Sequence, residues 1–231
     1  MAAATDYLSH DAEYRRRRSM GRQGWDEEGS FRQTLAAMEA FWGGPVPRVK
    51  SDVPTLIEFG CGAGDLAIYF ASHKFNTLGI DIAPFAIEWA REKAARRGVA
   101  ATFMVADLAR ELESPPPAAD VVLDGHCLHC IIGKDRRVFL RNAHRCVRPG
   151  GLFHVNTMCG TPHGANAAGF DPRSGCIIHQ GVARRYFGTA ESILEELAEA
   201  GFRVAGHRVL EARHDGDEDC LLVDARRESS K

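Results

Sequence analysis

The fold is decided by the stretch EFGCGAGD, residues 58–65. A short apolar segment, residues 55–59, leads into it, and a segment with helical spacing, residues 64–72, leads out of it. Glycine lets a backbone turn tightly and approach a ligand closely. The stretch therefore predicts a strand, a glycine-rich turn and a helix, with a small molecule held against the turn.

The spacing of the glycines argues against two common phosphate-binding motifs. The dinucleotide fingerprint places glycines at relative positions 1, 3 and 6, whereas Gly60, Gly62 and Gly64 occupy positions 1, 3 and 5. The carboxylates of Glu58 and Asp65 flank the turn and would repel a pyrophosphate. No Gly-Lys-Ser/Thr follows, so a P-loop is excluded as well. A ligand that carries an ammonium group and no phosphate fits these surroundings better.

Strands and helices alternate from residue 53 onward, which predicts a parallel sheet covered on both faces. The closing strands have no crossover helix between them, which predicts an antiparallel pair at one edge. The expected fold class is α/β: a seven-stranded, mostly parallel, doubly wound sheet with an antiparallel edge strand pair, plus an N-terminal helical cover. We expect strands at 55–59, 77–80, 102–106, 120–123, 152–156, 202–210 and 219–225, and helices at 64–72, 84–97, 134–147 and 189–200.

Two segments stand apart from this alternation. Residues 1–45 are polar but carry several aromatic side chains, and Leu35, Met38 and Phe41 recur at helical spacing. We expect one or two helices there, acting as a lid on a domain at 46–231. Residues 158–188 are rich in Gly, Pro and His, and we expect an irregular insertion on the substrate side.

Acidic side chains fall at the ends of four consecutive expected strands: Glu58, Asp81, Asp107 and Asp124. In open α/β sheets, ligands bind beyond the carboxyl ends of the strands. We therefore expect the four carboxylates to rim one crevice.

Composition sets the outer limits on function. The 231 residues are 45% hydrophobic and 26% charged, with a net charge of −2, which excludes disorder and argues against nucleic-acid binding through phosphate contacts. We find no run long enough for a transmembrane helix and no signal peptide. The seven cysteines are odd in number and scattered, which indicates reduced thiols in a cytoplasm.

Residues 53–157 resemble the class I methyltransferases, which use S-adenosylmethionine (SAM) and release S-adenosylhomocysteine. The order of the matching segments makes the resemblance specific. They correspond to the family's first three motifs, its fourth-strand region and the run before its fifth strand: EFGCGAG at 58–64, GIDIAP at 79–84, ADL at 106–108, residues 121–131, and RCVRPGG at 145–151.

The resemblance implies that the glycine-rich turn holds the methionine part of the cofactor. Gly60, Cys61 and Gly62 would pass under it, and Glu58 would lie close to its amino end or order water beside it. Two residues after the fourth strand would border the methionine as well: Gly125 and His126.

The same resemblance assigns the ribose and the adenine. Asp81 would accept both ribose hydroxyls, because a carboxylate takes two donors well. Ile82 would cover one face of the adenine. Asp107 would accept from the adenine amino group, with the amide of Leu108 nearby.

Candidate acceptor-site residues come from segments near the ends of the fourth and fifth strands. His129 is the leading base or orienting residue and His163 the second, because histidine accepts a proton near neutrality. Arg184 or Arg185 would clamp an anionic group, with Tyr186 beside them. Two aromatic residues of the N-terminal segment are further substrate-binding candidates: Tyr14 and Trp25.

The acceptor itself is expected to be a small molecule, with no nucleic-acid or membrane partner. The fourth strand ends in DGHC, residues 124–127, and not in the Asn/Asp-Pro-Pro-Tyr/Phe run of base and glutamine methyltransferases. A protein or RNA acceptor, and a thiol or soft metalloid acceptor, remain as alternatives. The cluster HCLHC at 126–130 leaves zinc binding open, although no metal is the preferred prediction.

Two rival functions belong to other classes. A nicotinamide dehydrogenase would use a similar sheet, but the glycine spacing and Glu58 argue against it. A SAM-binding scaffold or regulatory protein without catalysis would carry the same motifs, because these motifs report cofactor binding alone.

Overall fold

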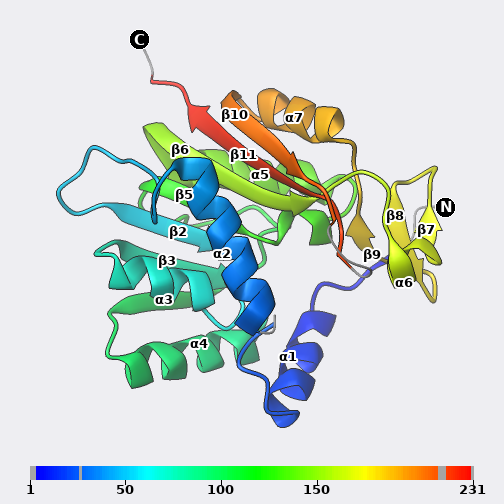
Figure 1. Ribbon diagram of the computed structural model, residues 1–231, viewed down its shortest axis with the longest axis horizontal. Coiled ribbons are helices and arrows are strands. Elements are labelled where there is room, and N and C mark those ends of the chain that lie inside the picture. The colour runs from blue at the N-terminus through cyan, green and yellow to red at the C-terminus, as the bar shows by residue number, and fades with distance from the viewer. Residues whose placement is uncertain (1–3, 26–27, 213–216, 230–231) are drawn as a thin grey trace.

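The structure is a computed structural model that describes residues 4–25, 28–212 and 217–229. A seven-stranded sheet with the order β10-β11-β6-β5-β2-β3-β4 forms its centre (Figure 1). All neighbours are parallel except β11, which runs antiparallel to both β6 and β10. The predicted fold class is confirmed. The strands are β2 (Thr55–Phe59), β3 (Asn76–Asp81), β4 (Ala101–Val105), β5 (Ala119–Gly125), β6 (Val147–Met158), β10 (Phe202–Leu210) and β11 (Cys220–Arg227).

Helices cover both faces of this sheet. Helices α2 (Glu28–Trp42), α3 (Asp65–Ser72) and α4 (Pro84–Arg97) lie on one face, and α5 (Asp135–Cys146) and α7 (Ala190–Glu199) on the other. The side chains of Met38 and Phe70 pack on the first face, and those of Phe139 and Leu197 pack on the second. None of the helices in the described ranges is long and apolar enough to cross a membrane.

The segment 158–188 is not irregular, and that prediction is wrong. It contains a short helix, α6 (Gly164–Ala167), and three short strands, β7 (Phe170–Asp171), β8 (Cys176–His179) and β9 (Val182–Tyr186). Its glycines serve the turns between these strands, since Gly175 and Gly181 both have positive φ angles. Strands of two to five residues are too short to show a period, so composition alone suggested a loop.

The N-terminal arm, which we define as residues 4–25, joins this small sheet to the main domain. Strand β1 (Ala4–Thr5) pairs in parallel with β9, and helix α1 (Ser9–Ser19) follows (Figure 1). Asp11 accepts a hydrogen bond from the amide of Phe85 at 2.7 Å, and Arg18 pairs with Glu92 at 2.6 Å. These contacts fasten α1 to α4. The two helices expected in residues 1–45 are thus present as α1 and α2.

Candidate functional site

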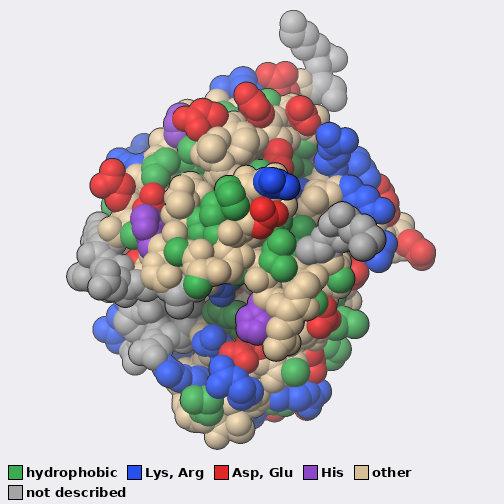
Figure 2. Space-filling view, turned by 90° about the vertical axis from the view of Figure 1, so that its right-hand side faces the viewer, with side chains coloured by type: hydrophobic (Ala, Val, Ile, Leu, Met, Phe, Trp, Pro, Cys, Tyr) green, Lys and Arg blue, Asp and Glu red, His purple; other side chains and the backbone are tan. Residues whose placement is uncertain are grey.

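A cavity of about 1180 Å³ lies at the carboxyl ends of the central strands, beneath the N-terminal arm. Figure 2 shows the molecule from the side of the small sheet, with a hollow near the centre of this face. Small-ligand pockets usually measure about 300–1,000 Å³, so this cavity has room for two small molecules together. Its walls come from the glycine-rich turn, the ends of β3 and β5, the N-terminal arm, α2, β9 and the ends of β10 and β11.

The glycine-rich turn needs its glycines for two physical reasons. Gly60, Gly62 and Gly64 have φ angles of 70°, 51° and 81°, in the left-handed region that other residues avoid. A β-carbon at Gly60 would also collide with the side chain of Cys127, and one at Gly62 with the hydroxyl of Tyr14. The turn therefore forms a cradle that packs tightly against Cys127 and Tyr14, and Gly60, Cys61 and Gly62 line the cavity.

Glu58 connects the glycine-rich turn to the helix that follows it. Its Oε2 accepts a hydrogen bond at 2.7 Å from the amide of Ala67, in the first turn of α3. The residue at the start of α3, Gly64, has no side chain to cap the helix, so the Glu58 carboxylate satisfies one of its free amides. Burial raises the pKa of Glu58 well above its usual range. Glu58 lines the cavity as well, in keeping with its expected place near the methionine part of a cofactor.

Asp81 fastens the turn to the end of β3. Its Oδ2 accepts from the amide of Gly62 at 2.8 Å, and its Oδ1 accepts from the amide of Ala83 at 2.9 Å. Burial raises the pKa of Asp81, and these hydrogen bonds oppose the rise. Asp81 also lines the cavity, where its carboxylate can accept from a ligand hydroxyl. Ile82 lines the cavity beside it.

Asp107 and Leu108 also line the cavity, at the turn after β4. Asp107 is half-buried, and its Oδ1 accepts from the amide of Ala109 at 2.9 Å. Leu108 is buried and packs into the core, so only part of it faces the ligand space. The pair lies where the resemblance places the adenine.

Asp124 does not rim the crevice, and that expectation is wrong. Its side chain is completely buried and is absent from the cavity wall. Its Oδ1 accepts from the amides of Cys127 and Leu128 at 2.8 and 2.9 Å, which turns the carboxylate inward. Burial raises the pKa of Asp124 to about 7. Three acidic side chains therefore face the cavity, and the fourth holds the turn that follows β5.

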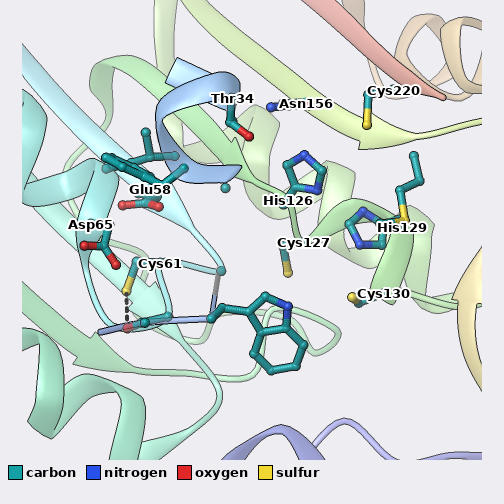
Figure 3. A pocket seen from close by; sticks show the side chains of 18 of the residues that line it. Thr34, Glu58, Cys61, Asp65, His126, Cys127, His129, Cys130, Asn156 and Cys220 are labelled. Carbon is teal, nitrogen blue, oxygen red and sulfur yellow. Dashed lines mark hydrogen bonds between the residues drawn. The ribbon is translucent and has the colours of Figure 1, made fainter. Parts of the chain in front are cut away.

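That turn, residues 126–131, carries two histidines into the cavity, and we call it the histidine turn. It contains a short 3-10 helix, η1 (Leu128–Cys130). Figure 3 shows His126 and His129 side by side, with Cys127 and Cys130 on the same turn and Cys220 reaching in from β11. The two imidazole rings lie 5.3 Å apart.

His129 is only 4% exposed, and its Nδ1 has no hydrogen-bond partner among the described residues. Burial, followed by the positive charge of His126 and Arg185, holds the pKa of His129 well below its usual range. Its ring is therefore uncharged at neutral pH and has a lone pair free to accept a proton.

The thiols around the histidine turn are protonated. Burial raises the pKa of Cys130 to about 11 and that of Cys220 to about 12. Protonated thiols are weak nucleophiles and weak metal ligands. Among the residues that the structure describes, no group of three or more suitable side chains is arranged to hold a metal ion.

The remaining predicted substrate-binding residues divide into two groups. Arg185 and Trp25 line the cavity, and Tyr14 lines it over Gly62, on the glycine-turn side and not beside the histidine turn. The others stay outside the cavity. Arg184 is exposed and donates to Ser9 Oγ at 2.7 Å, Tyr186 stacks on Arg136, and His163 is exposed with its Nε2 3.6 Å from Asp219.

The N-terminal arm also supplies two cavity residues that the sequence did not reveal, Tyr7 and His10. The Tyr7 hydroxyl donates to Asp135 and accepts from the amide of Ile132, both at 3.1 Å, so the arm is fixed just beyond the histidine turn. The Nδ1 of His10 lies 2.8 Å from the carbonyl oxygen of Tyr7. Both residues stand in a polar, aperiodic stretch that carries no signal of a site.

Comparison with known proteins bears on the central part of the chain. Residues 56–151 match the methyltransferase domain family. The chain is 33% identical over 104 residues to a ubiquinone biosynthesis O-methyltransferase of Methylobacterium nodulans, covering 45% of this chain and 41% of that protein. It is 36% identical over 113 residues to a ribosomal protein L11 methyltransferase of Dechloromonas aromatica, covering 47% and 34%. The chain thus spans less than half the length of these relatives.

The structure resembles solved methyltransferases over most of its length. One is the 1,6-didemethyltoxoflavin-N1-methyltransferase of Burkholderia thailandensis, solved with 1,6-didemethyltoxoflavin and S-adenosylhomocysteine bound. The TM-score is 0.68 at 22% identity, and the match covers 96% of this chain and 86% of that one. The match to the methyltransferase domain family covers residues 56–151, and the chain shares the fold of this solved methyltransferase, which holds S-adenosylhomocysteine.

Proposed function

We propose that the chain transfers a methyl group from SAM to a small molecule. The observation that carries the proposal is one cavity with two unlike halves. A glycine cradle with the acidic side chains of Glu58, Asp65, Asp81 and Asp107 forms the donor half, and the histidine turn with Arg185 forms the acceptor half. Two of the similar proteins are named for small molecules, ubiquinone biosynthesis in one case and 1,6-didemethyltoxoflavin in the other, which supports a small acceptor.

The residues of the donor half fit SAM. Bound there, the cofactor would supply a methyl group on a positively charged sulfur. Gly60, Cys61 and Gly62 line the cavity, and Asp81 lines it beside them as an acceptor for ribose hydroxyls. The carboxylates of Asp65 and Asp107 suit a cationic ligand and disfavour a pyrophosphate.

The acceptor half brings together His10, His126, His129 and Arg185. Acidic side chains also line the cavity near the ends of β10 and β11: Glu211, Asp217 and Glu218. An uncharged His129 can take the proton from a hydroxyl or ammonium acceptor as its nucleophilic atom is methylated. Arg185 supplies a charge that suits an acceptor with an anionic group, such as a phenolate or carboxylate.

We further propose that the N-terminal arm closes the site as a lid over domain 46–231, with the small sheet of residues 158–188 on the substrate side. The ammonium group of Lys93 donates to the Gln23 carbonyl at 2.7 Å and to Asp65 at 2.5 Å. Because Asp65 follows the glycine turn directly, the arm is tied to the cradle itself. A closed arm would exclude water from the methyl donor.

The setting we propose is the cytoplasm. All seven cysteines are free thiols within the described ranges, which suits a reducing compartment.

The direct test is methyl transfer from methyl-labelled SAM to a cell extract separated into a small-molecule filtrate and a macromolecular fraction. We expect label in the filtrate, and none with Asp81→Ala at the same SAM concentration. If label appeared in the macromolecular fraction alone, the methyl acceptor would be a protein or an RNA and not a small molecule. Binding of S-adenosylhomocysteine without any labelled product would favour the non-catalytic alternative.

Two neighbouring arginines give a matched test of the acceptor's charge. Arg185 lines the cavity, whereas Arg184 points to Ser9 outside it. With the labelled acceptor in hand, Arg185→Ala should raise the acceptor KM with little change in kcat, and Arg184→Ala should leave both unchanged. Equal KM values in the two variants would contradict an anion-binding Arg185.

A further inference from the structure

Arg136 occupies the centre of a buried network behind the histidine turn. It lies in the first turn of α5, and its side chain is only 4% exposed. Its Nε and Nη2 donate to the carboxylate of Glu196, in α7, at 2.8 and 2.6 Å. The ring of Tyr186, from β9, stacks on the guanidinium at 4.3 Å. One side chain thus joins α5, α7 and the small sheet.

The remaining donor of Arg136 reaches the histidine turn itself. Its Nη1 donates to the carbonyl oxygens of Leu128 at 2.6 Å and Ile131 at 3.2 Å. These two carbonyls flank His129. At the other end of the turn, Asp124 accepts from the amides of Cys127 and Leu128. The backbone around His129 is therefore fixed by a carboxylate on its amide side and by a guanidinium on its carbonyl side.

The imidazole of His129 needs such a backbone support. Its Nδ1 has no hydrogen-bond partner among the described residues, so no side chain orients the ring through that atom. His126, three residues earlier, has a φ angle of 65°, in the left-handed region that residues with a side chain seldom adopt. The direction of the His129 ring then depends on the hydrogen bonds of its backbone.

We infer that Arg136 is the positioning residue of the acceptor half: its guanidinium holds the histidine turn so that the His129 ring faces the methyl acceptor. The inference rests on the proposed function, which makes His129 the proton acceptor. It also explains why Tyr186 lies outside the cavity, since its ring completes the packing around Arg136 and does not touch the ligand space.

The charge of Arg136 acts on His129 together with its position. Burial is the first reason for the low pKa of His129, and Arg136 adds to it. The other charged and titratable groups that face His129 come from its own turn, from β9 and from α1: His126, Cys130, Arg185 and His10. Loss of Arg136 removes one positive charge from this set, so the pKa of His129 should rise.

The test is an NMR titration of the histidine ring protons in the full chain with saturating S-adenosylhomocysteine. The chain has ten histidines, and His129→Asn identifies the signal of His129 by its disappearance. In Arg136→Met we expect the His129 midpoint to move upward. Arg136→Lys keeps the charge but cannot reach Glu196 and both carbonyls at once. We expect its midpoint to stay closer to that of the wild type while the ring signal shifts and broadens.

Arg141→Met is the matched control, because Arg141 lies on the same helix but pairs with Glu111 at the surface, at 2.8 Å. It should leave the His129 signal unchanged. An unchanged signal and midpoint in Arg136→Lys, a folded variant, would overturn the inference even if Arg136→Met fails to fold. With a labelled acceptor, Arg136→Lys should lower kcat by about tenfold or more with the KM for SAM nearly constant. A wild-type chain that does not bind S-adenosylhomocysteine would defeat the proposed function, and the titration without ligand would still test the role of Arg136.

Discussion

The two halves of the cavity are built in different ways. The donor half comes from neighbouring pieces of chain, a turn of eight residues and the ends of two adjacent parallel strands. The acceptor half is assembled from α1, the histidine turn, β9 and the β10–β11 hairpin, which are far apart in the sequence. A site made of local backbone leaves a motif in the sequence, whereas a site made of distant side chains does not. Substitutions in the two halves should therefore change different quantities: the rate of methyl transfer in the acceptor half and the affinity for SAM in the donor half.

The largest effect should come from the acceptor half. His129→Asn roughly preserves the shape of the side chain but removes the proton acceptor. We expect the rate of methyl transfer to fall about 100-fold or more, with the affinity for SAM nearly unchanged. Steady-state kinetics and calorimetry on the same preparation measure the two quantities. A loss of less than about fivefold would make His129 part of the wall and not a base.

In the donor half, we expect substitutions to weaken the binding of SAM itself. Asp81→Ala removes a ribose acceptor and also frees the amide of Gly62, so SAM binding should weaken by about 1.5–3 kcal/mol. Asp107→Ala should cost less, about 0.5–1.5 kcal/mol, because one neutral amino group is assigned to it. Calorimetric titration with S-adenosylhomocysteine gives both values. Equal affinities for the wild type and Asp81→Ala would remove the ribose assignment.

A smaller effect on stability should separate Asp124 from the carboxylates of the donor half. Burial raises its pKa from 3.8 to about 7. Between these values the folded chain holds a proton that the unfolded chain releases, so this group lowers the free energy of unfolding as the pH rises through that window. Asp124→Asn keeps an oxygen for the amides of Cys127 and Leu128 and has no such proton.

We therefore expect the melting temperature of the wild type to fall by a few degrees relative to Asp124→Asn between about pH 5 and about pH 8. Thermal unfolding of both proteins at the two pH values measures this difference. Identical pH profiles would show that Asp124 is not buried in the way described.

The smallest effect concerns the N-terminal arm, which connects the halves. Bound S-adenosylhomocysteine should slow proteolytic cleavage within residues 4–25, because Tyr14 and Trp25 would then rest on ligand as well as on the domain. Residues 43–53, a connection outside the cavity wall, provide the internal control. Equal protection of both segments, or of neither, would argue against a lid.

The difference between the halves also sets what the sequence could predict. The alternation of strands and helices, the glycine turn and the place of Asp81 at a strand end follow from local patterns, and the fold class was predicted from them. The short strands of residues 158–188 were missed because they are too short to show a period. Tyr7, His10 and Cys220 reach the cavity through pairing of β1 with β9 and of β11 with β6, and no local pattern encodes such contacts.

The side chain of Asp124 shows that a sequence motif can also give a wrong prediction. Its place at a strand end suggested a ligand contact, yet the two amides that follow it turn the carboxylate inward. Arg136 shows the converse: in the sequence it is one arginine among many in a polar helix, and only tertiary packing brings it behind His129.

The central claim is that the glycine cradle and Asp81 bind SAM and leave the histidine turn free for an acceptor. Calorimetric titration of the wild-type chain with S-adenosylhomocysteine, NAD and NADP tests it most directly, with His129→Asn and Asp81→Ala titrated alongside. The account predicts one S-adenosylhomocysteine per chain, no binding of either dinucleotide, wild-type affinity in His129→Asn and clearly weaker binding in Asp81→Ala. Binding of a dinucleotide in place of S-adenosylhomocysteine, or equal loss of affinity in the two variants, would contradict it.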